Sequence, residues 1–347
     1  GNERWYFMTK KVRIGVIGAG RIGKIHVENL CYHVPGAEVI VISEIEAALP
    51  ATKAWAAPYG ITNIVSDPQA VISNPQVDAV LICSPTDTHA DLIIACAKAG
   101  KDIFCEKPIA NDLAKTKEAL SAVQKAGVKL QLGFNRRFDP NFKRVRSLVQ
   151  TTEFGEPQII KITSRDPEPP PAEYSKSSGG IFMDMTIHDF DMARYLAGSE
   201  VTEVYAAGSV LIDPAIGEAG DFDTAVILLK FANGSTGVID NSRQAVYGYD
   251  QRVEVFGSKG SAVAHNNTPT TVELSTDQGV FSDKPLYFFL ERYMESFAQE
   301  LREFVATLQE GTEPPVTGED GLQSLRIALA ATKSAHENRP VKITEIG

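Results

Sequence analysis

The chain has 347 residues, more than one hydrophobic core usually supports, so we expect two domains. Hydrophobic residues make up 43% of the chain and charged residues 22%, which is typical of a globular protein. A net charge of −10, with no basic run longer than Lys10 to Arg13, argues against nucleic-acid binding, which needs clustered basic side chains.

The four cysteines show no CxxC spacing, which argues against a zinc site and suits reduced thiols. No apolar stretch approaches the roughly 20 residues that span a bilayer, and the N-terminus lacks the apolar core of a signal peptide. We therefore expect a cytoplasmic protein with no membrane or nucleic-acid partner. Residues 1–7 precede Met8, which would serve as a natural start, so we treat them as a remnant of expression outside the fold.

From Val12 to about Phe134, short β-branched runs alternate with helical segments, which predicts a parallel sheet covered by helices. The two amphipathic segments between the last three strands stop at Gly100 and Gly127, as a left-handed C-cap prefers. We predict an α/β domain with a doubly wound parallel sheet over residues 8–134. The expected strands are 12–18, 38–43, 79–84, 102–106 and 129–134.

After Arg137 strands follow strands, joined by turn dipeptides such as Asn233-Gly234, which indicates a mostly antiparallel sheet. We predict a second, α+β domain over residues 135–347. It is expected to contain a proline-rich loop (166–174), a helix over about 180–196, strands at 224–231 and 252–257, and helices over about 287–310 and 318–337.

The motif G-x-G-x-x-G, formed by Gly18, Gly20 and Gly23 with Arg21 and Ile22 between the last two, lies directly after the first strand and opens a helix. In this context the glycines allow a tight turn, a close approach to a pyrophosphate and helix–strand packing.

Glu44 ends the second strand, where an acidic side chain bonds the adenosine ribose hydroxyls and repels a 2′-phosphate. The motif and this acid together favour NAD over NADP as cofactor. The alternative is a structural glycine turn with a solvated glutamate.

Two further turns should line the same crevice, because ligands bind at the carboxyl ends of parallel strands. One contains Ser84, Pro85, Thr86 and, further on, His89; the other contains Glu106, Lys107 and Pro108. His89 either caps the following helix or contacts the cofactor, and the two roles are compatible. Lys107 could hydrogen-bond a reacting hydroxyl and stabilise a developing alkoxide, or it could be an exposed strand-end lysine.

Asp184, His188 and Asp191 are spaced i, i+4 and i+7, which would place them on one helical face. An imidazole beside a carboxylate is a suitable proton acceptor for alcohol oxidation. A packed structural histidine is one alternative, and a metal site with one His and two carboxylates is another. A metal needs further ligands that the sequence does not offer, so we favour proton transfer and expect no metal.

The stretches GVIGAGRIG, SPTDTHADL, EKPIA and GGIFMDMTIHDFDMARY resemble the Gfo/Idh/MocA oxidoreductases, over essentially the full length. Within that family, GFNRRFDP, ITSRDPEPPP and AVYGYDQRVEVFG are similar to inositol dehydrogenases. The resemblance implies a Rossmann domain and an α/β domain whose large open sheet mediates homotetramer formation. It implies that Lys107, Asp184 and His188 are catalytic and that Arg136, Asp191 and Tyr249 contact the hydroxyls of a small polyol substrate.

The function that follows is oxidation of a ring hydroxyl of a cyclic polyol by NAD, with His188 as the general base. The resemblance makes myo-inositol, oxidised to scyllo-inosose, the leading substrate. Asn135, Ser164 and Met185 depart from the pattern of the inositol enzymes, which leaves the preferred stereoisomer open. The alternatives are a dehydrogenase of another inositol isomer or an aldose, and a non-catalytic NAD-binding regulatory member of the family.

Overall fold

A computed structural model describes residues 10–347, and the expectation about residues 1–7 lies outside them. The chain divides into two compact units. The first runs to Phe134 and takes in Phe297–Leu322, and the second comprises Asn135–Ser296 and Gln323–Gly347. Within residues 10–347, none of the helices combines the length and the apolar character that crossing a membrane would need.

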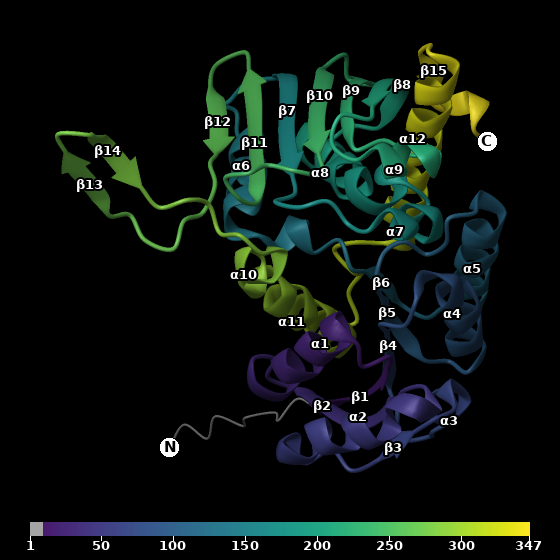
Figure 1. The fold of residues 1–347 in the computed structure, drawn as a ribbon. Coiled ribbons are helices and arrows are strands. Elements are labelled where there is room, and N and C mark those ends of the chain that lie inside the picture. Colours follow the sequence, from purple (N-terminus) through teal and green to yellow (C-terminus); the bar gives the residue numbers. More distant parts are fainter. Residues whose placement is uncertain (1–9) are drawn as a thin grey trace, which may run out of the picture. The chain divides into compact units, whose positions relative to one another are not determined.

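The first unit is built on a six-stranded parallel sheet with the order β3-β2-β1-β4-β5-β6 (Figure 1). This is the strand order of the dinucleotide-binding Rossmann fold. It confirms the predicted doubly wound domain, although β3, with two residues, is too short for its pattern to predict. The strands are β1 (Val12–Ile17), β2 (Ala37–Ser43), β3 (Ile64–Val65), β4 (Ala79–Ile82), β5 (Asp102–Cys105) and β6 (Leu130–Leu132).

The helices of this unit begin and end at residues suited to those positions. The side chain of Asp112 accepts a hydrogen bond from the Lys115 amide at 2.8 Å where α5 begins. Gly127 ends the same helix at φ +69°, and Gly100, just past α4, has φ +72°, as predicted for left-handed stops. The helices are α1 (Arg21–Tyr32), α2 (Leu49–Ala56), α3 (Pro68–Ile72), α4 (His89–Lys98) and α5 (Leu113–Ala126).

Residues 297–322 group with the first unit, although the sequence analysis places them in the second domain. Leu301, Phe304 and Val305 of α11 (Met294–Glu310) are buried in the core that also contains residues of β1 and β4. Their amphipathic spacing predicts a helix but does not specify which sheet the helix covers. The helix expected over 287–310 is also interrupted, because α10 (Phe289–Arg292) ends before α11 begins.

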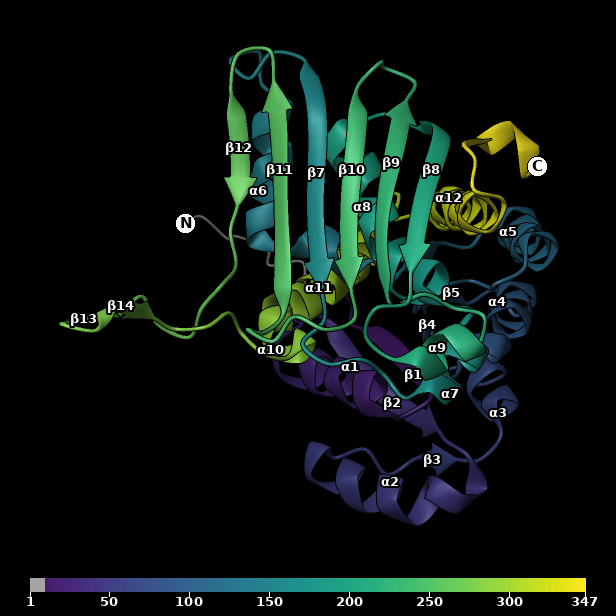
Figure 2. The same ribbon diagram turned by 45° about the horizontal axis from the view of Figure 1, so that its top comes forward.

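The second unit is built on a seven-stranded sheet with the order β12-β11-β7-β10-β9-β8-β15, of which Figure 2 shows the run from β12 to β8. Only β7 and β10 pair in parallel, so the sheet is mostly antiparallel, as predicted. The strands are β7 (Pro157–Arg165), β8 (Val201–Ser209), β9 (Thr224–Phe231), β10 (Thr236–Ser242), β11 (Asp250–Gly257), β12 (Ser261–Ala264) and β15 (Val341–Lys342).

Helices pack on one face of this sheet, and the strand residues alternate accordingly between buried and exposed. The other face carries exposed apolar side chains, which are Ile159, Val226, Leu228, Phe256 and Val263. The helices of the unit are α6 (Pro140–Val149), α7 (Ala172–Ser178), α8 (Ile187–Ala197), α9 (Pro214–Glu218), α10 and the greater part of α12 (Gly318–Glu337).

A π-helical turn over Phe182–Thr186 precedes α8, where the sequence predicts one regular helix. The hydroxyl of Thr186 lies within hydrogen-bonding distance of the Ile181 carbonyl oxygen and the Asn241 side-chain oxygen. A π turn has a different residue spacing from an α-helix, so the single regular helix on which the i, i+4, i+7 spacing of Asp184, His188 and Asp191 was based begins only at Ile187. The residue types in this stretch give no signal for such a turn.

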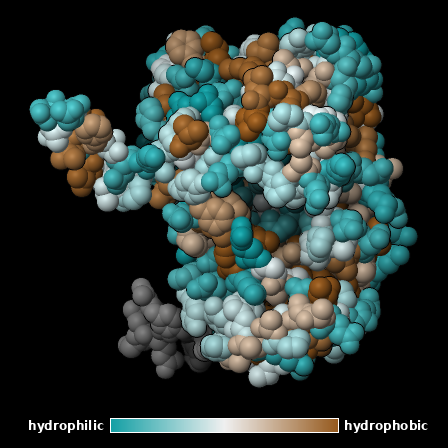
Figure 3. All heavy atoms as spheres, in the orientation of Figure 1, coloured by the Kyte–Doolittle hydropathy of each residue, from teal (hydrophilic) through white to brown (hydrophobic). Residues whose placement is uncertain are grey.

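A separate hairpin of β13 (Glu273–Thr276) and β14 (Gly279–Ser282) extends from the second unit (Figure 1). Every residue of β13 is exposed, and apolar side chains are visible on the hairpin in Figure 3.

Candidate functional site

The glycine-rich loop between β1 and α1 leaves no room for side chains at two of its three glycines. Gly18 has φ +93°, and a Cβ there would lie 2.7 Å from the Ser84 amide nitrogen. A Cβ at Gly23 would lie 2.2 Å from the Gly18 carbonyl oxygen. At Gly20, by contrast, a Cβ would meet no atom from elsewhere in residues 10–347 within 4 Å, so close protein packing does not explain this glycine. A phosphate approaching the backbone at the start of α1 does explain it.

Glu44 lies beside this loop. Its Oε2 accepts a hydrogen bond from the Ala19 amide at 2.6 Å, and the Gly18 amide donates to the Ser43 carbonyl at 2.9 Å. The carboxylate is therefore held next to the glycine loop and does not extend into solvent. A ribose-binding acid is expected at this position beside the loop.

His89 joins the two other turns at the carboxyl edge of the sheet. Its Nδ1 lies 2.7 Å from the Pro108 carbonyl oxygen, and its Nε2 lies 2.7 Å from the Ser84 carbonyl oxygen. A neutral imidazole can donate to only one of these acceptors at a time. The ring is buried, with 2% exposure. Because its two nitrogens face carbonyls of different turns, His89 links the turn after β4 to the turn that carries Lys107.

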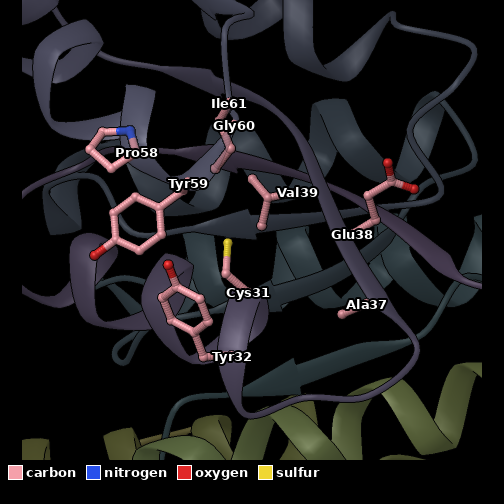
Figure 4. A pocket seen from close by; sticks show the side chains of 9 residues that line it. All are labelled: Cys31, Tyr32, Ala37, Glu38, Val39, Pro58, Tyr59, Gly60 and Ile61. Carbon is pink, nitrogen blue, oxygen red and sulfur yellow. The ribbon is translucent and has the colours of Figure 1, made fainter.

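A hollow of about 400 Å³ in the first unit lies elsewhere (Figure 4). Its lining includes Cys31, Tyr32 and Tyr59, together with Glu38 near the amino end of β2. The glycine loop and Glu44 lie at the opposite, carboxyl end of that strand, so this hollow is not the predicted cofactor site.

In the second unit, Asp184 lies in a polar cluster. Its Oδ1 accepts from the Tyr174 hydroxyl at 2.7 Å, and its Oδ2 accepts from Arg243 Nη2 at 3.1 Å. Arg243 also donates from Nη1 to Asp166 at 3.3 Å. Burial lowers the pKa of Arg243, but the two carboxylates outweigh it and the pKa is raised. His188 is half-buried, with its Nδ1 shielded from solvent.

Arg136 and Tyr249, which come from distant parts of the sequence, are brought together in the same unit. Arg136 donates from Nη1 to Asp189 Oδ1 at 3.0 Å and from Nη2 to the Tyr249 hydroxyl at 3.2 Å. Asn241 donates to the other oxygen of Asp189 at 2.9 Å. Burial raises the pKa of Asp189 to about 6, against the opposing effect of Arg136.

Asp191 is bound by a different arginine. Both of its oxygens accept from Arg137, at 2.8 Å and 2.7 Å, and it is 1% exposed. A contact between Asp191 and a substrate hydroxyl stays a prediction.

Sequence reasoning missed six polar residues of these clusters: Arg137, Asp166, Tyr174, Asp189, Asn241 and Arg243. Asp189 directly follows His188, but its partners are more than 50 residues away in sequence. Asp166 opens the proline-rich segment, which has the composition of an ordinary loop. No spacing signal could have found them. Within residues 10–347, no three His, Cys, Asp or Glu side chains are grouped as metal ligands would be.

Comparison with known proteins gives matches along both units. Residues 12–134 match the model of an oxidoreductase family with an NAD-binding Rossmann fold, and residues 142–263 match the GFO/IDH/MocA C-terminal domain. An uncharacterized oxidoreductase of Bacillus subtilis is 56% identical over 336 residues, covering 97% of this chain and 98% of that protein.

Two further matches have named activities. The myo-inositol 2-dehydrogenase of Thermotoga maritima is 53% identical, covering 96% of this chain and 99% of that protein. A crystal structure of scyllo-inositol dehydrogenase from Lactobacillus casei, with bound NAD(H) and scyllo-inositol, matches with a TM-score of 0.89 and 29% identity. That match covers 96% of this chain and 100% of the other.

Proposed function

The chain belongs to the Gfo/Idh/MocA oxidoreductase family, and from this premise we propose that it uses NAD to oxidise a ring hydroxyl of a cyclic polyol. The leading substrate is myo-inositol, which would give scyllo-inosose. The observation that carries this proposal is the 53% identity, over 96% of the chain, to a myo-inositol 2-dehydrogenase.

The first unit provides the cofactor site. NAD supplies the hydride acceptor when bound. The glycine loop and the first amides of α1 bind the pyrophosphate, and Glu44 accepts from the adenosine ribose hydroxyls. The remaining proposed cofactor contacts are Arg21, Ile22, Ser84, Pro85, Thr86, His89, Glu106 and Lys107.

His188 takes the proton of the reacting hydroxyl, and Asp184 orients its ring. Lys107 donates to the same hydroxyl oxygen and stabilises the charge that develops there. The contacts of Asp184 with Tyr174 and Arg243 support this assignment, because a carboxylate fixed from two sides can hold a neighbouring imidazole in one orientation.

Arg136, Tyr249 and Asp191 are assigned to the substrate's hydroxyls. A guanidinium, a phenol and a carboxylate can donate to or accept from a ring of hydroxyls without requiring a charged substrate. The burial of Arg136 and Tyr249 supports this role, because a shielded donor gains more from a hydroxyl partner than a solvated one.

A second candidate is the dehydrogenation of another inositol isomer, and the similarity to a scyllo-inositol dehydrogenase favours it. A regulatory member without activity would have no chemical reason to keep Lys107, Asp184 and His188 together.

We also propose a homotetramer assembled through the open face of the seven-stranded sheet. Val226 and Leu228 are each 47% exposed on that face, and a row of such side chains on a flat sheet favours covering by another subunit. The four cysteines are free, which suits the reducing cytoplasm, where we place the enzyme.

The direct test is NADH absorbance with a panel of inositol isomers and aldoses, each with NAD and with NADP. We expect the highest kcat/KM with myo-inositol and NAD. A higher value for another isomer would reassign the substrate. A protein that binds NAD but oxidises none of the panel would favour the regulatory role.

A further inference from the structure

The core of the first unit contains a polar cluster that the proposed reaction does not use. His26 of α1 is 0% exposed, and its Nε2 is paired with Oε1 of Glu106, the residue after β5. The imidazole packs edge-on against Phe104 at 5.4 Å and Phe297 at 6.1 Å between ring centroids. The pair therefore joins the helix that follows the glycine loop to the turn that carries Lys107.

A second carboxyl, that of Glu300 on α11, is buried beside this pair. Glu300 is 0% exposed, and neither of its side-chain oxygens has a hydrogen-bond partner among residues 10–347. Burial raises the pKa of Glu300 well above its usual range, and the charge of Glu106 raises it further. Gln131 donates to the Glu300 carbonyl at 3.0 Å, which fixes the backbone at this point of the helix.

The surroundings of Glu300 favour its neutral form. An ionised Glu300 would add a buried negative charge beside the Glu106 carboxyl, and its oxygens have no hydrogen-bond donor among residues 10–347 to stabilise that charge. Two thiols, those of Cys83 and Cys105, also lie close to Glu106. Burial and the charge of Glu106 raise the pKa of both thiols, so both stay neutral and add no charge to the cluster.

Glu106 has little freedom to move away from this arrangement. A Cβ at Gly133 would lie 2.5 Å from Glu106 Oε2, so the glycine is what leaves room for the carboxylate. His26 holds the other oxygen. On the far side of Lys107, the Pro108 carbonyl is bonded to His89. The residues on both sides of Lys107 are thus held by contacts with His26 and His89.

We propose that Glu300 carries a proton in the folded protein at neutral pH, and that this neutral carboxyl is a positioning residue for the Glu106–Lys107 turn. It fills the space behind Glu106 without repelling the Glu106 carboxylate. The protonation of Glu300 and the position of the turn do not depend on the proposed function. An effect on turnover does, because it requires Lys107 to act on the substrate.

The proton is tested by infrared difference spectroscopy of the wild type against Glu300→Gln at neutral pH. We expect the carbonyl band of a protonated carboxylic acid in the wild type and its loss in Glu300→Gln. The control Glu310→Gln, at an exposed position on the same helix, should keep the band. A wild type without this band would overturn the proposal, and the measurement does not depend on any enzymatic activity.

Positioning is tested by comparing Glu300→Gln with Glu300→Ala. The glutamine is neutral and of the same shape, so it should keep the turn in place and restore the kcat that alanine loses, with KM for NAD little changed. Crystal structures should show the Glu106–Lys107 turn displaced in the alanine variant only. An undisplaced turn in Glu300→Ala, or equal displacement in both variants, would overturn the positioning role. If the wild type shows the carboxylic-acid band and the expected geometry of the Glu106–Lys107 turn but oxidises no polyol, the proposed function is contradicted and the positioning role is not.

Discussion

Arg243 donates from Nη2 to Oδ2 of Asp184 at 3.1 Å, and the arginine is 4% exposed. The same side chain reaches Asp166, so one buried cation holds two carboxylates from different parts of the chain. Because Asp184 is the residue that we assign to orient His188, Arg243 is a further residue on which the orientation of the general base depends.

Replacing Arg243 with Gln should lower kcat by up to about 100-fold, because small misplacements of catalytic groups are costly. The Kd for NAD should be unchanged, since the proposed cofactor contacts all belong to the first unit. Tyr174→Phe removes only the phenol donor to Asp184 and should cause a smaller loss. Steady-state kinetics would contradict the role if Arg243→Gln, shown by circular dichroism to be folded, kept the wild-type kcat.

Asp189 should make stability depend on pH in a defined window. Burial raises its pKa from 3.8 to about 6, so between these values the folded chain retains a proton that the unfolded chain has lost. The unfolding free energy should therefore fall as pH rises through this window, by on the order of 3 kcal/mol from this group, and level off above it.

Denaturant unfolding of the wild type and Asp189→Asn at several pH values measures this effect. The unfolding free energy of Asp189→Asn should not show this fall with pH. It should also be lower than that of the wild type by an amount independent of pH, because Arg136 loses its carboxylate partner. Asp277→Asn, at an exposed position in the hairpin, is the control and should keep the wild-type slope. Equal slopes in the wild type and Asp189→Asn would show that Asp189 titrates normally.

Glu44→Ala should weaken NAD binding by about 10- to 100-fold, the usual loss for a hydrogen bond to a charged group. It should also shift the NAD-to-NADP ratio of kcat/KM toward NADP, because the charge opposing a 2′-phosphate is gone. Glu46→Ala, exposed two residues further on, is the control. An unchanged cofactor ratio in Glu44→Ala would mean that the ribose acceptor is another residue.

Leu228→Arg should break the proposed tetramer, because it places a charge in the centre of the apolar sheet face. Light scattering should give a tetramer mass for the wild type and a smaller mass for the variant. Lys117→Glu, exposed on α5, should leave the tetramer intact. A wild type that is monomeric at working concentration would contradict the assembly.

The first domain could be predicted closely because its signals are local. Each long strand is a β-branched run, and the glycines at 100 and 127 mark helix ends through their own backbone preferences. Local sequence signals could not predict the two-residue strand β3 or the sheet against which the helix α11 packs. A short strand has no periodicity, and the apolar face of a helix does not specify the sheet that buries it.

The polar clusters could be predicted only in part. The motif around Asp184 and His188 was recognisable, but the π turn was not, because no residue type marks it. The ion pair between Arg136 and Asp189 joins residues 53 positions apart, and the packing of the second unit brings them together. Side chains whose partners depend on tertiary packing leave no spacing pattern in the sequence.

The central claim, that His188 is the general base, is tested most directly by the turnover and NAD affinity of His188→Ala. Loss of a positioned proton acceptor should lower kcat by about 10²- to 10⁴-fold. The Kd for NAD, measured separately by fluorescence titration, should stay at the wild-type value. A His188→Ala protein that turns over at the wild-type rate once saturated with NAD and polyol would contradict the account.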